Sequence, residues 1–245
     1  GLITGDKNRV NFFALPGVPK EMKSMFTNYV LPEIEKSLKN KVVCKSIRTT
    51  GVPESILQEK ITDIIDANKE KCDIAFLPHR MLGVDIRLTS SDNQLVEDLI
   101  NSIVPRIKKY VYGYDNDKLE QVIADLLIQN NLTVSTAESC TSGLLASRLT
   151  DVPGSSQYFK GGSVCYSNEL KINDIGVDKD LIEKYGAVSE EVAESLAKNI
   201  AQKNNTDIGI GITGIAGPGG GTEKKPVGLV FVGIFYKNNF RNTGR

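Results

Sequence analysis

Hydrophobic and polar positions divide the chain into three stretches with different patterns. In the first stretch, residues 1–40, Asn11–Leu15 has the apolar run of a short buried strand, and a helix is predicted from Lys20 to about Leu38, with Pro32 at a kink or at its end. One strand and one helix bury too little apolar surface to form a core. We therefore expect this stretch to be the remnant of a larger domain, or to pack on the domain that follows.

The second stretch, residues 41–114, alternates between strand and helix patterns. The predicted elements are a strand, a helix, two strands across a turn at His79–Leu82 and a second helix: Val42–Thr50, Pro53–Asn68, Asp73–Pro78, Gly83–Thr89 and Ser91–Lys109. This order predicts a small α+β layer with both helices on one face of a short sheet. A layer of this size could be a nucleic-acid module, but Val42–Tyr110 carries ten basic and ten acidic residues and no GxxG clamp between helices. Nucleic acid is therefore not an expected partner.

The third stretch, residues 115–245, alternates helices with strands that are apolar almost throughout. Periodicity predicts helices at Leu119–Leu127, beyond Gly143, at Asn168–Ile175 and beyond Ser189, and strands at Leu132–Thr136, Tyr158–Tyr166, Asp207–Thr213 and Val227–Tyr236. Strands that are apolar on both faces are typical of an α/β sheet with helices on each side. We therefore predict such a sheet, with a long glycine loop between its last two strands.

Composition narrows the possible functions. The 245 residues contain 30 Lys and Arg and 30 Asp and Glu, so the net charge is zero, which does not favour polyanionic partners or membrane surfaces. The chain has no run of 18 apolar residues and no signal peptide, and we expect a cytoplasmic protein. Its four cysteines are widely spaced, without a CxxC pair, which predicts reduced thiols and no zinc site.

The single histidine, His79, limits the catalytic chemistry that the chain can perform. An HExxH zinc site is impossible, and a Ser-His-Asp triad elsewhere in the chain has no base. Catalysis must then use Ser, Thr, Cys, Lys, Tyr or carboxylate groups. His79 and the four cysteines have no partner nearby in sequence, and we interpret them as structural residues.

The first candidate site is the strand-to-helix turn Thr136–Gly143. Four hydroxyl or thiol groups gather there, on Ser139, Cys140, Thr141 and Ser142. Unpaired N–H groups at a helix start can hold an oxyanion or a phosphate, whereas the commonest role of such residues is to cap the helix. One cap needs only one of them, so catalysis and capping both stay open.

Two further candidates lie downstream. Tyr166–Lys171 follows an apolar strand, and Lys171 would be a base if burial kept it neutral, although most lysines are solvated. Gly209-x-Gly211-x-x-Gly214 matches the dinucleotide fingerprint by letter, but the glycines that follow, Gly217–Gly221, forbid the helix that this fingerprint requires. Ile208–Gly228 is then either a connector or a loop that offers N–H groups to an anion.

Five stretches, in their order and spacing, resemble the C-terminal nicotinamide-nucleotide amidohydrolase domain of the CinA family (competence/damage-inducible proteins): Thr136–Gly143, Tyr166–Lys171, Gly186–Ser189, Thr213–Pro218 and Lys225–Gly228. Upstream, Ile47–Ser55 is similar to the family's KH-like middle domain, and Leu15–Met22 to the end of its molybdopterin-binding-like N-terminal domain. Family members usually have glycine where Ser142 stands.

The resemblance implies three parts. These are a molybdopterin-binding-like remnant at 1–40, a small α+β KH-like domain at 41–114 and a layered α/β amidohydrolase domain at 115–245. In some relatives the complete N-terminal domain carries a metal-dependent ADP-ribose pyrophosphatase, which we do not expect of the remnant. Relatives continue past Arg245 with an arginine-bearing segment and a final helix. Thr243–Arg245 resembles the beginning of that segment, and the C-terminal domain is expected to be truncated.

For function, the resemblance implies hydrolysis of the carboxamide of nicotinamide mononucleotide to nicotinic acid mononucleotide and ammonia, a step of pyridine nucleotide salvage. Ser139 is then the nucleophile, and a neutral Lys171 takes its proton and later helps to protonate ammonia. N–H groups at the helix start after Ser139 hold the oxyanion, while Tyr166 and Ser167 orient or shuttle the proton. Neither a cofactor nor a metal is implied. The substrate-binding residues are expected to be Cys140, Thr141, Ser167, Asn168, Thr213, Gly214, Ala216 and Gly217, with loop amides near the phosphate.

Other functions stay open at this point. The chain could be a regulatory or interaction protein of competence or DNA damage whose pocket senses a nucleotide, or an enzyme for a different amide. The expected partners are the small-molecule nucleotide and further copies of the chain in a homo-oligomer.

Overall fold

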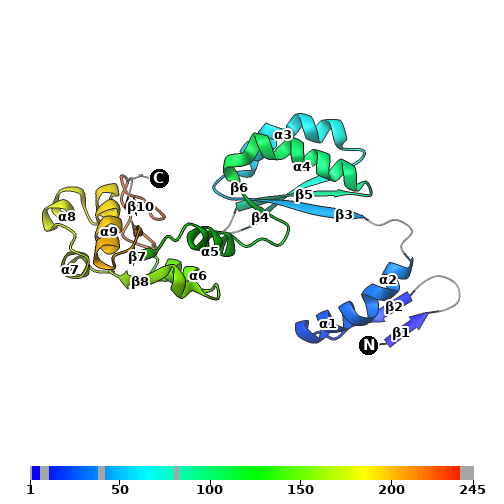
Figure 1. The fold of residues 1–245 in the computed structure, drawn as a ribbon, viewed down its shortest axis with the longest axis horizontal. Coiled ribbons are helices and arrows are strands. Elements are labelled where there is room, and N and C mark those ends of the chain that lie inside the picture. Colours follow the sequence, from blue (N-terminus) through cyan, green and yellow to red (C-terminus); the bar gives the residue numbers. More distant parts are fainter. Residues whose placement is uncertain (1, 6–10, 38–41, 80–82, 238–245) are drawn as a thin grey trace. The chain divides into compact units, whose positions relative to one another are not determined.

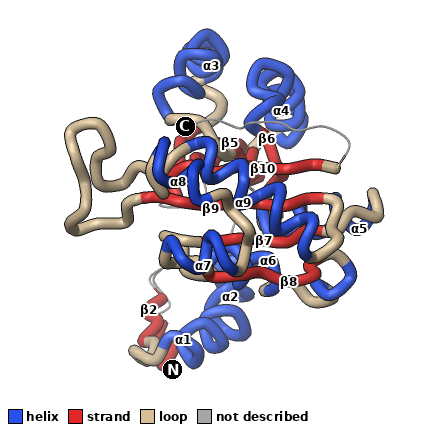
Figure 2. The backbone as a smooth tube through the Cα atoms, turned by 90° about the vertical axis from the view of Figure 1, so that its left-hand side faces the viewer, coloured by secondary structure: helices blue, strands red, loops and turns tan. Residues whose placement is uncertain are grey.

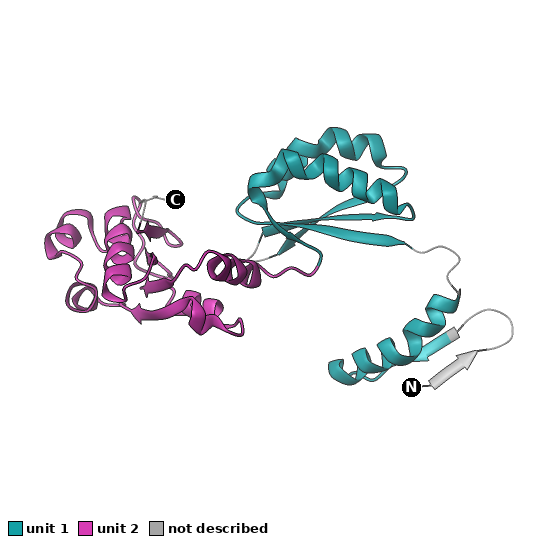
Figure 3. Ribbon diagram, in the orientation of Figure 1, with its two compact units in different colours: residues 1–115 teal, residues 116–245 magenta. Residues whose placement is uncertain are grey.

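The structure is a computed structural model that describes residues 2–5, 11–37, 42–79 and 83–237. The chain divides into two compact units, Gly1–Asp115 and Asn116–Arg245 (Figure 3). Within the described ranges no helix is long and apolar enough to cross a membrane. The helix end expected near Leu38, most of the turn expected at His79–Leu82 and the segment Thr243–Arg245 lie outside the described residues.

The N-terminal segment forms a two-stranded antiparallel ribbon followed by helical turns (Figure 1). Its elements are β1 (Leu2–Gly5), β2 (Asn11–Ala14), α1 (Pro19–Met25), the π-helical turn η1 (Phe26–Val30) and α2 (Leu31–Ser37). The helical backbone continues through Pro32, because the wider π turn just before it accommodates a residue without an N–H donor. β1 was not predicted. The prediction of a buried strand at Asn11–Leu15 is wrong in its burial, since Phe12 is 68% exposed on a ribbon of only two strands.

The rest of the first unit is an antiparallel sheet with both helices on one face, as predicted (Figure 1). The strands are β3 (Val43–Thr49), β4 (Asp73–His79), β5 (Gly83–Ser90) and β6 (Val111–Tyr114), in the order β4-β5-β3-β6; the helices are α3 (Glu54–Asn68) and α4 (Asn93–Ile107). Ile47, Ile86 and Leu88 of the sheet are fully buried in the same core as Leu57 and Ile103 of the helices. The edge strand β6 was not predicted, because four residues are too few for a period to be recognised.

The second unit is a four-stranded sheet with helices on both faces (Figure 2). In chain order it contains α5 (Leu119–Gln129), β7 (Val134–Glu138), α6 (Leu144–Thr150), β8 (Phe159–Val164), α7 (Asn168–Asn173), α8 (Lys179–Tyr185), α9 (Glu190–Lys203), β9 (Ile208–Gly214) and β10 (Val230–Tyr236). The strand order is β10-β9-β7-β8, with β7, β8 and β9 parallel and β10 antiparallel to β9. One core lies beneath α9 and a second beneath α5 and α6, which confirms the predicted α/β layering.

Alternating glycines bring α9 directly against the sheet. A side chain at Gly209 would overlap Ala197 of α9, and one at Gly211 or Gly233 would overlap Ala193. Because the glycines of β9 place no side chains on this face, the α9 backbone packs directly against the β9 backbone. This close contact fixes the distance between α9 and β9. This contact holds the end of β9 at the edge where β7 and β8 also end.

Replacing Gly211 with alanine is expected to lower the free energy of unfolding of the second unit by about 3 kcal/mol, because the added methyl group overlaps the α9 backbone. Urea denaturation measures the change. The matched control is Gly219→Ala, where an added Cβ has no neighbour within 4 Å. Equal unfolding midpoints for the two variants would show that the α9–β9 contact is not as tight as described.

Candidate active site

Three of the stretches singled out in the sequence meet where the parallel strands end. Ser139 follows β7, Tyr166 follows β8 after Cys165, and Gly214 is the last residue of β9. A Cβ placed on Gly214 would lie 2.9 Å from the sulfur of Cys140, so the ends of β7 and β9 are in contact. The carboxyl edge of a parallel sheet is the usual position of an α/β active site.

Ser139 and Lys171 form a buried pair at this edge. The distance between Ser139 Oγ and Lys171 Nζ is 3.0 Å, and the two residues are only 7% and 2% exposed. The Ser139 N–H donates to Ile212 O at 2.9 Å, which anchors the serine to β9. Lys171 projects from α7, whose first turn is capped by the Ser167 hydroxyl. Two residues 32 positions apart thus meet through the ends of adjacent strands.

The surroundings of Lys171 favour a neutral amine. Burial lowers the pKa of Lys171 below its usual value. No ion pair links it to a carboxylate in the described ranges. The nearby thiols of Cys140 and Cys165 supply no negative charge near neutral pH, because burial raises the pKa of both. A buried ammonium at this position would therefore have only uncharged oxygen atoms as partners, and the net effect of burial is a lowered pKa for Lys171.

The three contacts of Lys171 match the bonding capacity of a neutral amine. Nζ lies 3.0 Å from Cys165 O and 3.1 Å from Tyr166 O, in addition to its contact with Ser139. A neutral amine has two N–H donors and one lone pair. In the neutral form the two carbonyl oxygens accept the two N–H bonds, which leaves the lone pair for the Ser139 hydroxyl; an ammonium would donate to Ser139 Oγ as well. This is the geometry of a general base that accepts the proton of a serine nucleophile.

Glu138 corrects the expected position of the oxyanion donors. Its buried carboxylate accepts hydrogen bonds from the N–H groups of Gly143 (3.1 Å), Leu145 (3.1 Å) and Ala146 (2.8 Å). The first turn of α6 is therefore already occupied by a protein carboxylate and cannot hold a substrate oxyanion. The sequence suggested a helix cap within Thr136–Gly143, but Glu138, which was not singled out, provides it.

The remaining donors are the two N–H groups that directly follow the serine. Ser142 N donates to Ser139 O and Leu144 N to Thr141 O, which closes the turn. The N–H groups of Cys140 and Thr141 face the Cys140 thiol, a weak acceptor, and donate to no oxygen acceptor within the part of the chain that the structure describes. We therefore assign the candidate oxyanion site to these two amides. The Thr141 hydroxyl is also buried, and it has no hydrogen-bond partner among the described residues.

Other predicted residues are close to the pair but differ in what they contact. Tyr166 is 66% exposed, and only its main-chain oxygen reaches Lys171. The Ser167 hydroxyl accepts from Leu170 N as the cap of α7, and Asn168 is the exposed first residue of that helix. A proton-shuttling role for Tyr166 or Ser167 thus has no side-chain contact with the pair to support it in the described residues.

The substrate-binding residues predicted near the glycine loop also differ in whether they contact other parts of the fold or are accessible to a ligand. Thr213 is buried, and its hydroxyl donates to Ala187 O at 2.7 Å, so its side chain is used internally. Gly214 packs against Cys140, as described above. Ala216 is exposed at the start of the loop, and Gly217 has the left-handed φ of +84° that favours glycine. Ala216 and Gly217 are therefore the members of this group that a ligand can reach.

Ser142 has a conformation that explains the glycine usual in the family pattern. Its φ is +50°, in the left-handed region that costs a side chain about 1–2 kcal/mol. Its hydroxyl lies 3.5 Å from Ser139 O, too far for a strong compensating hydrogen bond. Ser142 thus has a strained backbone conformation in the turn, and it is not part of the Ser139–Lys171 pair.

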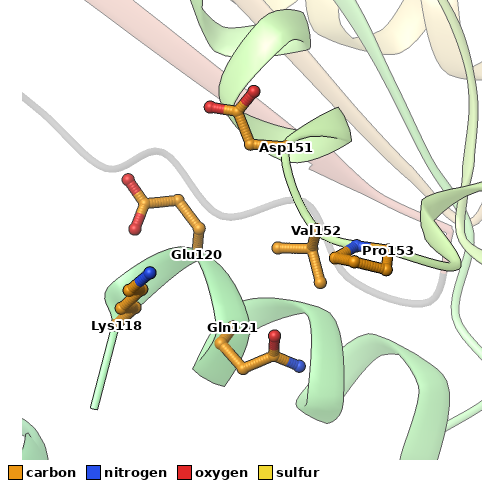
Figure 4. A pocket seen from close by; sticks show the side chains of 6 residues that line it. All are labelled: Lys118, Glu120, Gln121, Asp151, Val152 and Pro153. Carbon is orange, nitrogen blue, oxygen red and sulfur yellow. The ribbon is translucent and has the colours of Figure 1, made fainter. Parts of the chain in front are cut away.

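A cavity of about 310 Å³ lies elsewhere in this unit, between the start of α5 and the end of α6 (Figure 4). It is lined by Lys118, Glu120, Gln121, Asp151, Val152 and Pro153. Ser139 and Lys171 are not among these residues, since Ser139 precedes α6 and the cavity lies beyond the other end of that helix. The cavity is therefore separate from the candidate active site.

Replacing Glu138 with glutamine is expected to lower the free energy of unfolding by about 2–3 kcal/mol, because the new NH₂ group faces backbone donors. Urea denaturation of the chain measures this, with exposed Glu223→Gln as the control that makes the same chemical change. Equal stability of the two variants would contradict the capping role.

Comparison with known proteins identifies the family of this chain. The CinA C-terminal domain model matches residues 116–244, and the damage-inducible protein CinA KH domain model matches residues 44–113. A CinA-like protein of Dictyoglomus thermophilum is 41% identical over 241 residues, which cover 97% of this chain and 58% of that protein. The chain thus spans less than two thirds of that relative's length.

Two crystal structures resemble about half of the chain. The competence/damage inducible protein CihA of Agrobacterium tumefaciens is 38% identical with a TM-score of 0.50, covering 51% of this chain and 76% of that one. A CinA superfamily protein of Enterobacter cloacae is 29% identical with a TM-score of 0.50, and the match covers 53% of this chain and 79% of that one. Since the C-terminal family model alone matches more than half of its residues, this chain belongs to the CinA family.

Proposed function

We propose that the C-terminal unit hydrolyses the carboxamide of nicotinamide mononucleotide to nicotinic acid mononucleotide and ammonia. The observation that carries the proposal is the buried Ser139–Lys171 pair, with 3.0 Å between Oγ and Nζ. A serine hydroxyl beside a desolvated amine is an activated nucleophile for acyl transfer, and an amide is a substrate of that class. The choice of substrate rests on the resemblance of five sequence stretches to the amidohydrolase domain of the family.

The first half of the reaction releases ammonia. Lys171 takes the proton of the Ser139 hydroxyl as Oγ attacks the carboxamide carbon. The N–H groups of Cys140 and Thr141 stabilise the negative charge that develops on the carboxamide oxygen. The protonated Lys171 then gives its proton to the departing nitrogen, the C–N bond breaks, and ammonia leaves an ester between Ser139 and the nicotinoyl group.

The second half regenerates the enzyme. A water molecule attacks the ester carbon while Lys171 accepts a proton from it, and the same two amides stabilise the oxyanion. Lys171 returns this proton to Ser139 Oγ as the ester bond breaks. The products are nicotinic acid mononucleotide and free Ser139, so one water molecule is consumed for each ammonia released.

The glycine loop between β9 and β10 supports a nucleotide as substrate. It begins beside Cys140 at Gly214, and its exposed glycines Gly219, Gly220 and Gly221 leave backbone N–H groups accessible. Consecutive backbone N–H groups in such a loop are a common binding site for phosphate. A mononucleotide whose carboxamide lies at Ser139 would place its phosphate on the side of this loop.

The test is ammonia release by this chain from nicotinamide mononucleotide, nicotinamide riboside and nicotinamide at equal concentrations. We expect the mononucleotide to be hydrolysed fastest, because only it can use the loop amides as well as the catalytic pair. Faster hydrolysis of the riboside or of nicotinamide would indicate a different amide substrate. Binding of the mononucleotide without ammonia release would favour a nucleotide sensor and overturn the proposal.

A further inference from the structure

The glycine loop is folded back on itself as a hairpin. At its base, Ile215 N donates to Leu229 O and Gly228 N donates to Ile215 O, at 2.9 and 2.8 Å. At its far end, Thr222 N donates to Lys225 O, and Lys225 N donates to the Thr222 hydroxyl. The loop therefore has an internal hydrogen-bonded structure, which a free connector would lack.

The side chain of Lys225 attaches this hairpin to the junction between α8 and α9. Its Nζ donates to Tyr185 O at 2.8 Å and to Val188 O at 2.6 Å. Tyr185 is the last residue of α8, where helix carbonyls lack intrahelical partners and a positive charge is favourable. The junction fits the lysine closely, since a Cβ on Gly186 would lie 3.0 Å from Nζ.

A second hydrogen bond joins the same junction to the other end of the hairpin. Thr213 Oγ1 donates to Ala187 O, and Thr213 immediately precedes Gly214, which contacts Cys140 beside the nucleophile. The backbone between Tyr185 and Val188 thus accepts three side-chain hydrogen bonds, one from β9 and two from the hairpin. Through these bonds the hairpin and the catalytic edge of the sheet share one fixed support.

We infer that Lys225 is a positioning residue, which fixes the hairpin 215–229 on the α8–α9 junction so that its backbone N–H groups meet the phosphate of the substrate. This inference rests on the proposed function. Two of the three N–H donors of the Lys225 ammonium are taken by carbonyl oxygens, so it acts by holding the loop. Its neighbour Lys224 is exposed and has no such contacts among the described residues.

The test compares Lys225→Met, which keeps most of the stem and removes the donors, with Lys224→Met as a matched control and Lys225→Arg as the conservative variant. We expect Lys225→Met to raise KM for nicotinamide mononucleotide about tenfold with kcat nearly unchanged, because lost charge-assisted hydrogen bonds loosen the loop. Lys224→Met should match the wild type, and Lys225→Arg should recover part of the loss. Calorimetric binding of nicotinamide riboside, which lacks the phosphate, should be equal in all four proteins.

The outcomes separate this inference from the proposed function. Equal KM values for the two methionine variants, or an equal loss of riboside and mononucleotide binding in Lys225→Met, would overturn the positioning role. If the wild type releases no ammonia, the proposed function fails, and calorimetric binding of the mononucleotide then decides about Lys225 alone. Affinity that falls in Lys225→Met only would support the inference, and unchanged or undetectable binding would overturn it.

Discussion

Replacement of Ser139 with alanine is expected to lower kcat/KM for nicotinamide mononucleotide by about ten-thousandfold or more, since no other hydroxyl contacts Lys171 among the described residues. The variant keeps the main-chain hydrogen bond from residue 139 to Ile212 O, so the turn and the amides of Cys140 and Thr141 should remain in place. Ammonia release measures the activity, and substrate binding should change much less than turnover.

Ser142→Ala is the matched control for this variant. It removes a hydroxyl three residues away in the same turn, whose contact with Ser139 O is 3.5 Å long. We expect its activity to stay within about twofold of the wild type. Full deamidase activity in Ser139→Ala would contradict the serine mechanism. An equal loss in both variants would assign the effect to the turn and not to the nucleophile.

Replacement of Lys171 with methionine is expected to reduce kcat by about a thousandfold, the range typical for loss of a general base. In the wild type, activity should rise with pH as Lys171 loses its proton. The midpoint should lie below the usual lysine value of about 10.4, because burial lowers the pKa of Lys171. The pH profile of kcat/KM checks this. A midpoint at the usual lysine value would contradict a neutral base at physiological pH.

The same variant should be more stable than the wild type near neutral pH. Between its lowered pKa in the fold and the usual lysine value, Lys171 is neutral in the fold and protonated in the unfolded chain, so in this range unfolding takes up a proton and becomes less favourable as the pH rises. The stability advantage of Lys171→Met should therefore shrink between the lowered pKa and about 10.4. Urea denaturation at several pH values measures it, with exposed Lys198→Met as the control. A difference that does not depend on pH would contradict the lowered pKa.

Much of the fold could be predicted from the periodicity of the chain. The helices at Glu54–Asn68 and Asn93–Ile107 have apolar positions three and four residues apart, and such a pattern survives in any context. Three short elements were missed. β1, β6 and α8 contain four, four and seven residues, and their formation depends on neighbours that are distant in sequence.

The candidate site could be predicted only in part. Residue patterns alone favoured a capping serine and a solvated lysine, and it was the resemblance to a family that singled out Ser139 and Lys171. Glu138 escaped notice because a carboxylate just before a hydroxyl-rich helix start is ordinary in sequence. The sequence did offer one signal, because a carboxylate close to a helix start is a favourable capping group. Only the structure shows that its partners are three backbone N–H groups of the α6 start. Lys225 gave no comparable signal, since its acceptors belong to a different part of the chain.

The sequence by itself determined the layers of this protein, because hydrophobic periodicity and glycine spacing act over a few residues and specify which faces are covered. It also determined which chemical groups exist, a single histidine among them, and so restricted the possible reactions. Only the tertiary structure decided which of those groups become reactive. Proximity of Ser139 to Lys171, loss of water around the amine and occupation of the α6 amides by Glu138 all arise when strand ends meet, and desolvation is a property of the packed chain.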